Sequence, residues 1–303
     1  MSAHCIRGPD AGGNDGAGTV GTIALSRLGA TVTGHFPVSL RDVPSAGNHV
    51  ELELGNTIAR LVLNRPERRN ALSQNVMVEM LRALDSVAAD ETARVLVIEG
   101  RGPVFSAGHD LAEMTENREP EFYEALFSTC VRLMTGVQEL PQPVIAKVHG
   151  VATAAGCQLV AACDLAVASD EARFATPGVN IGLFCSTPMV PVARTIGRKR
   201  ALEMLFTGEM IDARTALDWG LVNRVVQAED LDTEVTALAE RIASASPYVV
   251  ALGKRAFYAQ DQLPEADAYK ITAPAMVANA QADDALEGMR AFLEKRAPQW
   301  RNR

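Results

Sequence analysis

Two segments of the sequence combine a predicted strand, a group of small residues and a predicted helix start. They are VLVIEGRGPVFSAGHDL, which ends at Leu111, and VIAKVHGVATAAGCQL, which ends at Leu159. The first backbone N–H groups of a helix have no internal partner and carry partial positive charge. Two such groups aimed at one carbonyl oxygen form an oxyanion hole, and small residues let a substrate approach them. Taken singly, each segment fits tight strand–helix packing better than a site.

Two histidines and one glycine pattern offer further chemistry. His109 closes the small-residue group of the first segment and precedes an aspartate, a setting that suits a general base or a metal ligand. His149 stands in a predicted strand before a glycine, which is typical of a packing histidine. Gly16, Gly18 and Gly21 form G-x-G-x-x-G, but no strand precedes them, so they predict a flexible linker rather than a dinucleotide site.

The elements that must position these residues alternate along the chain from residue 50. Residues 50–63 predict a hairpin around Gly55-Asn56, and helical spacing of Val76, Met80, Leu84 and Val87 predicts a helix. Alternating strands and helices predict an α/β fold with parallel pairing. Further strands are expected in 93–100, 144–150, 164–174 and 221–226, and further helices in 122–140, 154–162, 188–208, 212–220, 230–258 and 264–296.

Length and composition restrict the class of protein. The 303 residues carry a net charge of −8, which argues against a nucleic-acid binder. No apolar run is long enough to span a bilayer. The cysteines, odd in number and without a Cys-x-x-Cys pair, indicate neither a disulfide framework nor a zinc site and fit a reducing compartment. They are Cys5, Cys130, Cys157, Cys163 and Cys185.

Together, these segments resemble the crotonase, or enoyl-CoA hydratase/isomerase, superfamily from about Val50 to Arg296. The resemblance rests on LNRPERRNALS, GPVFSAGHDLAEM, the stretch from VIAKVHG to VNIGL, RKRALEMLFTGEMIDARTALDWGLVNRVV and FLEKRAP. LFCSTP after Gly182 is most similar to a vertebrate enoyl-CoA hydratase domain-containing subgroup and its bacterial relatives. The implied fold is an α/β crotonase (ClpP-like) spiral of ββα units, followed by a C-terminal helical region that forms trimers.

The resemblance also implies a domain plan. Residues 1–48, which are rich in glycine and polar residues, are expected to be a mostly disordered tail. Residues 49–246 would form the spiral core with the acyl-CoA site, and 247–303 the helical oligomerisation region.

Site residues follow from the matching motifs. The thioester carbonyl would be held by the backbone N–H groups of His109 and Ala155, so that the His109 side chain is secondary. Coenzyme A, as part of the substrate, would be the only cofactor-like group. Its expected contacts are Arg69, Ala71, Ala107 and Lys295.

The two glutamates that flank the substrate in hydratases of this family are missing from this sequence. The matching positions here hold Gln158 and Gly178. An amide does not transfer a proton at neutral pH, and glycine has no side chain. Glutamates placed at both positions are expected to raise hydratase activity. Substitute catalytic groups stay open among Gln158, Cys185, Ser186, Glu113 and Asp110.

Two functions of different classes fit this pattern. One is an enoyl-CoA hydratase-like enzyme, a lyase or isomerase, that acts on acyl-CoA thioesters in fatty-acid or acyl-CoA metabolism. In this enzyme, hydration by two glutamates is doubtful. The other is a non-catalytic acyl-CoA-binding regulatory protein. The expected partners are an acyl-CoA and further copies of the chain, as a homotrimer or dimer of trimers. The expected location is the cytoplasm of a bacterium or, in a eukaryote, the mitochondrial matrix.

Overall fold

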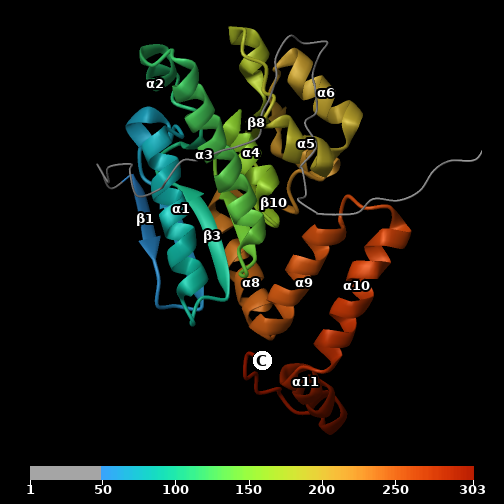
Figure 1. Ribbon diagram of the computed structural model, residues 1–303. Coiled ribbons are helices and arrows are strands. Elements are labelled where there is room, and N and C mark those ends of the chain that lie inside the picture. Colours follow the sequence, from blue (N-terminus) through green and yellow to red (C-terminus); the bar gives the residue numbers. More distant parts are fainter. Residues whose placement is uncertain (1–48) are drawn as a thin grey trace, which may run out of the picture. The chain divides into compact units, whose positions relative to one another are not determined.

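The computed structural model describes residues 49–303. The predicted disordered tail, the G-x-G-x-x-G pattern and Cys5 lie outside the described residues. In the described part, the α/β fold with parallel strand pairing is confirmed (Figure 1).

A six-stranded sheet forms the centre of the described part, in the order β1-β2-β3-β5-β7-β10. The predicted hairpin joins β1 and β2 in antiparallel fashion, and the other neighbours are parallel. The buried strand β3 places Leu96 and Ile98 in one hydrophobic cluster and Val95 and Val97 in another, so both faces of the sheet are covered. The strands are β1 Val50–Glu53, β2 Ile58–Leu63, β3 Val95–Gly100, β5 Val144–Val148, β7 Leu165–Ser169 and β10 Arg224–Val226.

A smaller four-stranded sheet, which the sequence patterns did not indicate, has the order β4-β6-β8-β9. Three strands of the large sheet are each followed directly by a strand of this small one, β3 by β4, β5 by β6 and β7 by β8. Strands β4, β6 and β8 are parallel, and β9 pairs with β8 in antiparallel fashion. The small strands are β4 Val104–Ser106, β6 Val151–Thr153, β8 Arg173–Ala175 and β9 Ile211–Asp212.

Helices cover the two faces of the large sheet. The amphipathic helices α1 and α3 pack together and contribute to the main cluster, whereas α8 covers the opposite face with residues such as Leu231 and Val235. Ser73 caps α1, and Asp110 caps α2 by accepting from the Ala112 and Glu113 amides. The first helices are α1 Gln74–Ala89, α2 Leu111–Glu116, α3 Pro120–Glu139, α4 Ala155–Ala162, α5 Met189–Ile196, α6 Arg198–Thr207 and α7 Ala213–Trp219, with 3-10 turns at Pro66–Arg68, Pro177–Ile181 and Ala228–Asp230.

The C-terminal helices are shorter than the sequence patterns predict. The expected helix 230–258 is broken before Pro247, and 264–296 is broken at 281–282, after which a new helix begins at Asp283. The segments are α8 Leu231–Ala243, α9 Pro247–Gln260, α10 Glu265–Ala280 and α11 Asp283–Glu294. Helices α9 and α10 lie side by side (Figure 1). Neither contains a fully buried residue.

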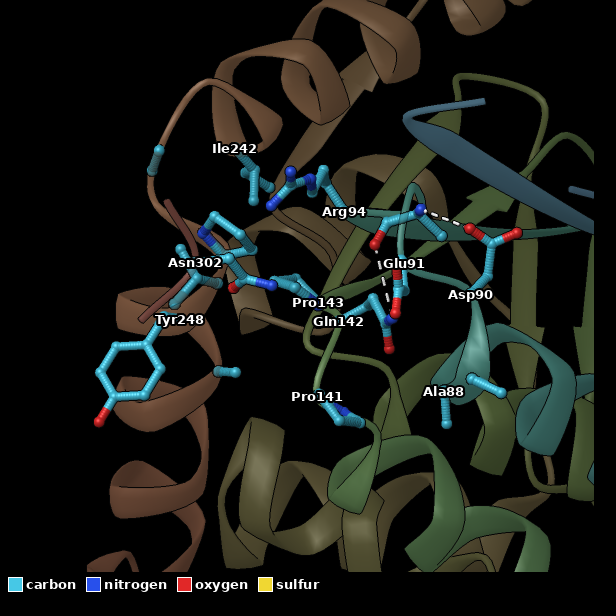
Figure 2. A pocket seen from close by; sticks show the side chains of 16 residues that line it. Ala88, Asp90, Glu91, Arg94, Pro141, Gln142, Pro143, Ile242, Tyr248 and Asn302 are labelled. Carbon is cyan, nitrogen blue, oxygen red and sulfur yellow. Dashed lines mark hydrogen bonds between the residues drawn. The ribbon is translucent and has the colours of Figure 1, made fainter. Parts of the chain in front are cut away.

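A hollow of about 330 Å³ lies where the start of α9 meets the connection between α1 and β3. Figure 2 shows Arg94, Gln142, Tyr248 and Asn302 around it. Gln142 Nε2 donates to the carbonyl oxygens of Val87 at 2.9 Å and Ala93 at 3.4 Å, which ties this connection to the segment before β5. The described residues that line this hollow include no histidine, cysteine, serine or lysine, so it is not the site that the sequence predicts.

Candidate functional site

The two predicted segments meet because of the small sheet. Its strands β4, β6 and β8 are parallel neighbours, so their carboxyl ends lie side by side. The Ala154 amide donates to Ala175 O at 2.9 Å, which joins the end of β6 to that of β8. The segments that follow the three strands therefore meet at one edge of the sheet: 107–109, 154–155 and 176–178.

The residues just before the two predicted amides have unusual backbone conformations. Gly108 has φ +88°, and Ala154 has φ 51° and ψ −119°, a region that is costly for any residue with a Cβ. A Cβ placed on Gly108 would stand 3.0 Å from the Ala155 nitrogen, so the segments are in close contact. Ala155 is the first residue of α4, and its N–H has no acceptor within the helix. The geometry thus brings the His109 and Ala155 backbones to the same place.

An apolar cavity of about 410 Å³ opens at this place. Among the described residues, no aspartate or glutamate lines it. Predicted site residues that line it are Ala107, His109, Ala155, Gly178, Cys185 and Ser186. The other lining residues are Leu111, Phe127, Ala154, Pro177, Asn180, Ile181, Leu183, Phe184, Thr187 and Pro188.

The His109 side chain is held on the wall of this cavity. Its Nδ1 donates to Leu72 O at 3.3 Å, and its ring meets Phe127 edge to face at 5.5 Å. Nε2 is buried and has no hydrogen-bond partner within the described part. Burial lowers the pKa of His109 below its ordinary value, and the hydrogen bond to Leu72 opposes this more weakly. Residues 49–303 contain no cluster of three or more metal-ligating side chains that would support the metal-ligand alternative.

Gly178 has no room for a side chain. A Cβ on Gly178 would overlap Leu183 O and would stand 2.8 Å from Cys185 Sγ. The Leu183 amide donates to Gly178 O at 2.9 Å, which fixes the 182–186 loop against this position. The expectation that glutamates at 158 and 178 raise hydratase activity is therefore corrected, because a side chain at 178 would first displace this loop.

Cys185 lies beside Gly178, in the space that a side chain at 178 would need. Only 8% of Cys185 is exposed, and burial raises the pKa of its thiol, opposed by a hydrogen bond from the Gly178 amide. All four described cysteines are free and buried.

The other catalytic candidates lie elsewhere. Gln158 is 3% exposed, accepts a weak hydrogen bond from the Cys130 thiol at 3.7 Å and is not among the cavity-lining residues. Asp110 forms an ion pair with Arg65 at 2.8 Å. Glu113 accepts from the Gln74 amide. Both carboxylates line a separate hollow of about 580 Å³.

The predicted coenzyme A residues are only partly brought together. The Ala107 amide donates to Arg69 O at 3.0 Å, so Arg69, which is exposed, and the buried Ala71 lie close to the cavity-lining segment. Lys295 ends α11, where it is exposed and outside the set of residues that line the cavity.

The apolar wall of the cavity was not predicted. Phe127 comes from α3, and Ile181, Leu183 and Phe184 come from the segment after β8. Amphipathic spacing marks Phe127 as a packing residue, but no local pattern in the sequence assigns these side chains to a common cavity.

Comparisons with known proteins agree with this architecture. The sequence model of the enoyl-CoA hydratase/isomerase family matches residues 53–303. The mitochondrial enoyl-CoA hydratase domain-containing protein 3 of Xenopus laevis is 50% identical over 249 residues, which cover 82% of this chain and 85% of that protein. In the part that the structure describes, no helix has the length and apolar character needed to cross a bilayer.

Two crystal structures are similar throughout the described part. Human enoyl-CoA hydratase domain-containing protein 3 is 47% identical with a TM-score of 0.81, over 84% of this chain and 100% of that chain. An enoyl-CoA hydratase of Mycobacterium smegmatis is 47% identical with a TM-score of 0.82, over 84% and 99%. The chain therefore belongs to the enoyl-CoA hydratase/isomerase family of the crotonase superfamily, in the subgroup of the enoyl-CoA hydratase domain-containing proteins.

Proposed function

We propose that the chain binds acyl-CoA thioesters with the acyl group in the apolar cavity and the thioester oxygen between the His109 and Ala155 amides. The observation that carries this proposal is the close approach of the two backbone segments at the cavity wall. The positive φ values of Gly108 and Ala154 support it, because strained backbone of this kind is often found where a ligand is held.

Two amides on one thioester oxygen would polarise the carbonyl group and stabilise the enolate that forms when an α-proton leaves. One donor of this kind contributes roughly 10²–10³-fold to a rate. Hydration by two carboxylates has no support, because position 178 has no space for a side chain and Gln158 is an amide. The reaction we propose is therefore enolisation of the bound thioester, in which solvent water takes the α-proton, as a step toward isomerisation or a related conversion.

A second function, acyl-CoA binding without turnover, is favoured by the composition of the cavity wall. Among the described residues, no aspartate or glutamate lines the cavity, and the pKa of its histidine is lowered. Such a protein would sequester thioesters or respond to them as a regulatory module.

One experiment separates the two functions. Butyryl-CoA is incubated with the full chain in deuterium oxide, and loss of the α-proton signal is followed by NMR while calorimetry measures binding. Binding with exchange faster than in buffer supports enolisation, and binding without exchange supports the non-catalytic function. Absence of binding would contradict both proposals. Crotonyl-CoA in the same assay should give no 3-hydroxybutyryl-CoA.

We further propose that the chain forms homotrimers or dimers of trimers through its C-terminal helices. Support comes from large apolar side chains left exposed on α10 and α11, among them Met276 at 64% and Phe292 at 83%. The Xenopus relative is named as mitochondrial. For this chain we propose a reducing compartment, either a bacterial cytoplasm or a mitochondrial matrix.

A further inference from the structure

The apolar wall of the acyl cavity continues beyond the cavity onto the surface of the molecule. Ile181 and Phe184 line the cavity, and yet 60% of Ile181 and 39% of Phe184 are exposed. The Phe184 ring meets the ring of Phe206, on α6, at a centroid distance of 6.1 Å. Phe206 is 62% exposed and is not among the cavity-lining residues. An apolar surface therefore leads from the cavity, through Phe184, to the outside of α6.

The end of α6 is fixed against the wall of the same cavity. A Cβ placed on Gly208, the residue after α6, would stand 2.6 Å from Asn180 Nδ2 and 3.1 Å from Pro177 Cα. Asn180 and Pro177 both line the cavity. Met210, which follows this turn, is 57% exposed. Exposed apolar side chains that adjoin a cavity are typical of a binding surface.

We propose that the site selects thioesters of long hydrocarbon acids, with the distal part of the acyl chain lying on Phe184 and Phe206 outside the cavity. This inference rests on the proposed function, because the thioester must first occupy the cavity. The occupant follows from the continuity of the surface. A chain that begins at the thioester and outgrows the cavity leaves it over Phe184 and stays on apolar side chains.

The size of the cavity sets the chain length at which the outer surface begins to matter. A water molecule occupies about 30 Å³ in the liquid and a methylene group is of similar size, so a cavity of about 410 Å³ holds roughly a dozen such groups. The thioester group takes part of this space, and an octanoyl chain takes most of the rest. A palmitoyl chain exceeds the cavity, so its last methylenes must lie on an apolar surface or enter water.

The chemistry of the wall restricts the chain to a hydrocarbon. Among the described residues, no aspartate, glutamate, lysine or arginine lines the cavity. Burial lowers the pKa of His109, so its ring is neutral and supplies no cation. A carboxylate at the end of a short acyl chain would be buried without a counter-charge. Succinyl-CoA should therefore bind at least about tenfold more weakly than butyryl-CoA, which has the same number of acyl carbons.

Calorimetric titration of the full chain with butyryl-CoA, octanoyl-CoA and palmitoyl-CoA, each below its micelle concentration, tests the proposal. The affinity should rise from butyryl-CoA to octanoyl-CoA as the cavity fills. It should rise again from octanoyl-CoA to palmitoyl-CoA, by up to about fourfold for each further methylene that leaves water. A chain confined to the cavity would give no gain in this second step.

Phe206→Ser isolates the outer surface. It should weaken palmitoyl-CoA binding by about three- to tenfold, as expected when a half-buried phenylalanine is lost. It should leave octanoyl-CoA binding unchanged, because that chain ends inside the cavity. The unchanged octanoyl-CoA affinity also shows that the variant is folded.

Phe257→Ser is the matched control for this variant. Phe257 lies on α9, is 57% exposed and meets one aromatic ring, that of Tyr258, at 5.5 Å. It does not line the acyl cavity. Both affinities should therefore stay as they are in the unmodified chain.

Several outcomes would overturn the inference. Equal affinities for octanoyl-CoA and palmitoyl-CoA, or for butyryl-CoA and succinyl-CoA, would refute the selection and leave the proposed function standing. Equal losses of palmitoyl-CoA affinity in the two variants would indicate unspecific adsorption of long chains. A Phe206→Ser variant with a changed assembly mass in light scattering and an unchanged palmitoyl-CoA affinity would assign Phe206 to a contact between copies of the chain. A protein that binds none of the thioesters would refute the proposed function as well.

Discussion

At the scale of single residues, the site depends on a glycine that holds two segments together. Gly108 has φ +88°, and a Cβ there would approach Ala154 Cβ to 2.8 Å and the Ala155 nitrogen to 3.0 Å. Gly108→Ala should therefore displace the Ala155 amide. We expect α-proton exchange of butyryl-CoA to fall by about 10²-fold, as when one donor of an oxyanion hole is lost.

A matched control separates this effect from backbone strain. Gly55 has φ +85°, and a Cβ there would meet no atom within 4 Å. Gly55→Ala should cost stability, roughly 1–3 kcal/mol, without changing exchange. Equal loss of exchange in the two variants, measured on protein shown to be folded by circular dichroism, would mean that the Ala155 amide has no part in the site.

His109 also predicts a pH dependence of stability. Burial lowers the pKa of His109 in the folded chain below its ordinary value of 6.5, whereas the unfolded chain takes up the proton near that value. The unfolded state then binds more protons in the window just below 6.5. Stability should be fully present above that pH and should fall as the pH is lowered, by at most about 1.4 kcal/mol per pH unit.

Urea unfolding at several pH values, compared between the unmodified chain and His109→Phe, isolates this contribution. Burial lowers the pKa of His149 as well, but His149 is present in both proteins and its effect cancels in the difference. An identical pH dependence for the two proteins would show that His109 titrates normally in the fold.

At the scale of elements, one partly buried ion pair attaches α9 to the core. Lys254 Nζ donates to Asp164 Oδ2 at 2.7 Å and to the carbonyl oxygens of Val137 and Gln142, both at 3.0 Å, and Tyr258 donates to Asp164 Oδ1 at 2.8 Å. The Lys254 side chain is only 7% exposed. Lys254→Ala leaves a partly buried carboxylate without its cation, so the free energy of unfolding should drop by about 3 kcal/mol, the low end for a buried pair.

Tyr258→Phe is the milder variant of the same contact. It removes one hydrogen bond and leaves the ion pair, so the loss should be about 1 kcal/mol. Urea denaturation measures the free energy of unfolding of both variants. If they were equally destabilised, the ion pair would contribute nothing beyond the tyrosine hydrogen bond.

Some helices and strands could be predicted from the sequence and others could not. Long elements with a clear period, such as α1 and the buried strand β3, were predicted because their own side chains define the pattern. The three-residue strands β4 and β6 carry too few residues for a period, and their pairing joins segments far apart in the chain. The segments that carry the two expected amides could be located because Ala155 begins α4 and His109 precedes the Asp110 cap of α2. The position of the 182–186 loop beside Gly178 could not be predicted, because it depends on a contact between Leu183 and Gly178.

At the scale of the whole molecule, the C-terminal helices leave apolar surface uncovered in the single chain. Phe292 and Leu293 on α11 are 83% and 79% exposed, and α10 contributes Tyr269, Met276 and Val277. Burying large apolar side chains is the main driving force for association. If this surface forms the proposed homotrimer or dimer of trimers, light scattering should give three times, or six times, the chain mass of 32.4 kDa.

Charges on this surface should prevent assembly. Phe292→Glu combined with Leu293→Glu would bury two carboxylates in the interface, at a cost that apolar contacts do not offset. The variant should elute as a monomer, whereas Leu54→Glu, a control at an exposed apolar position in the β1–β2 hairpin, should keep the assembly. If the double variant still assembles, the contact uses another surface. If it becomes monomeric and still binds butyryl-CoA, the residues of one chain suffice for binding.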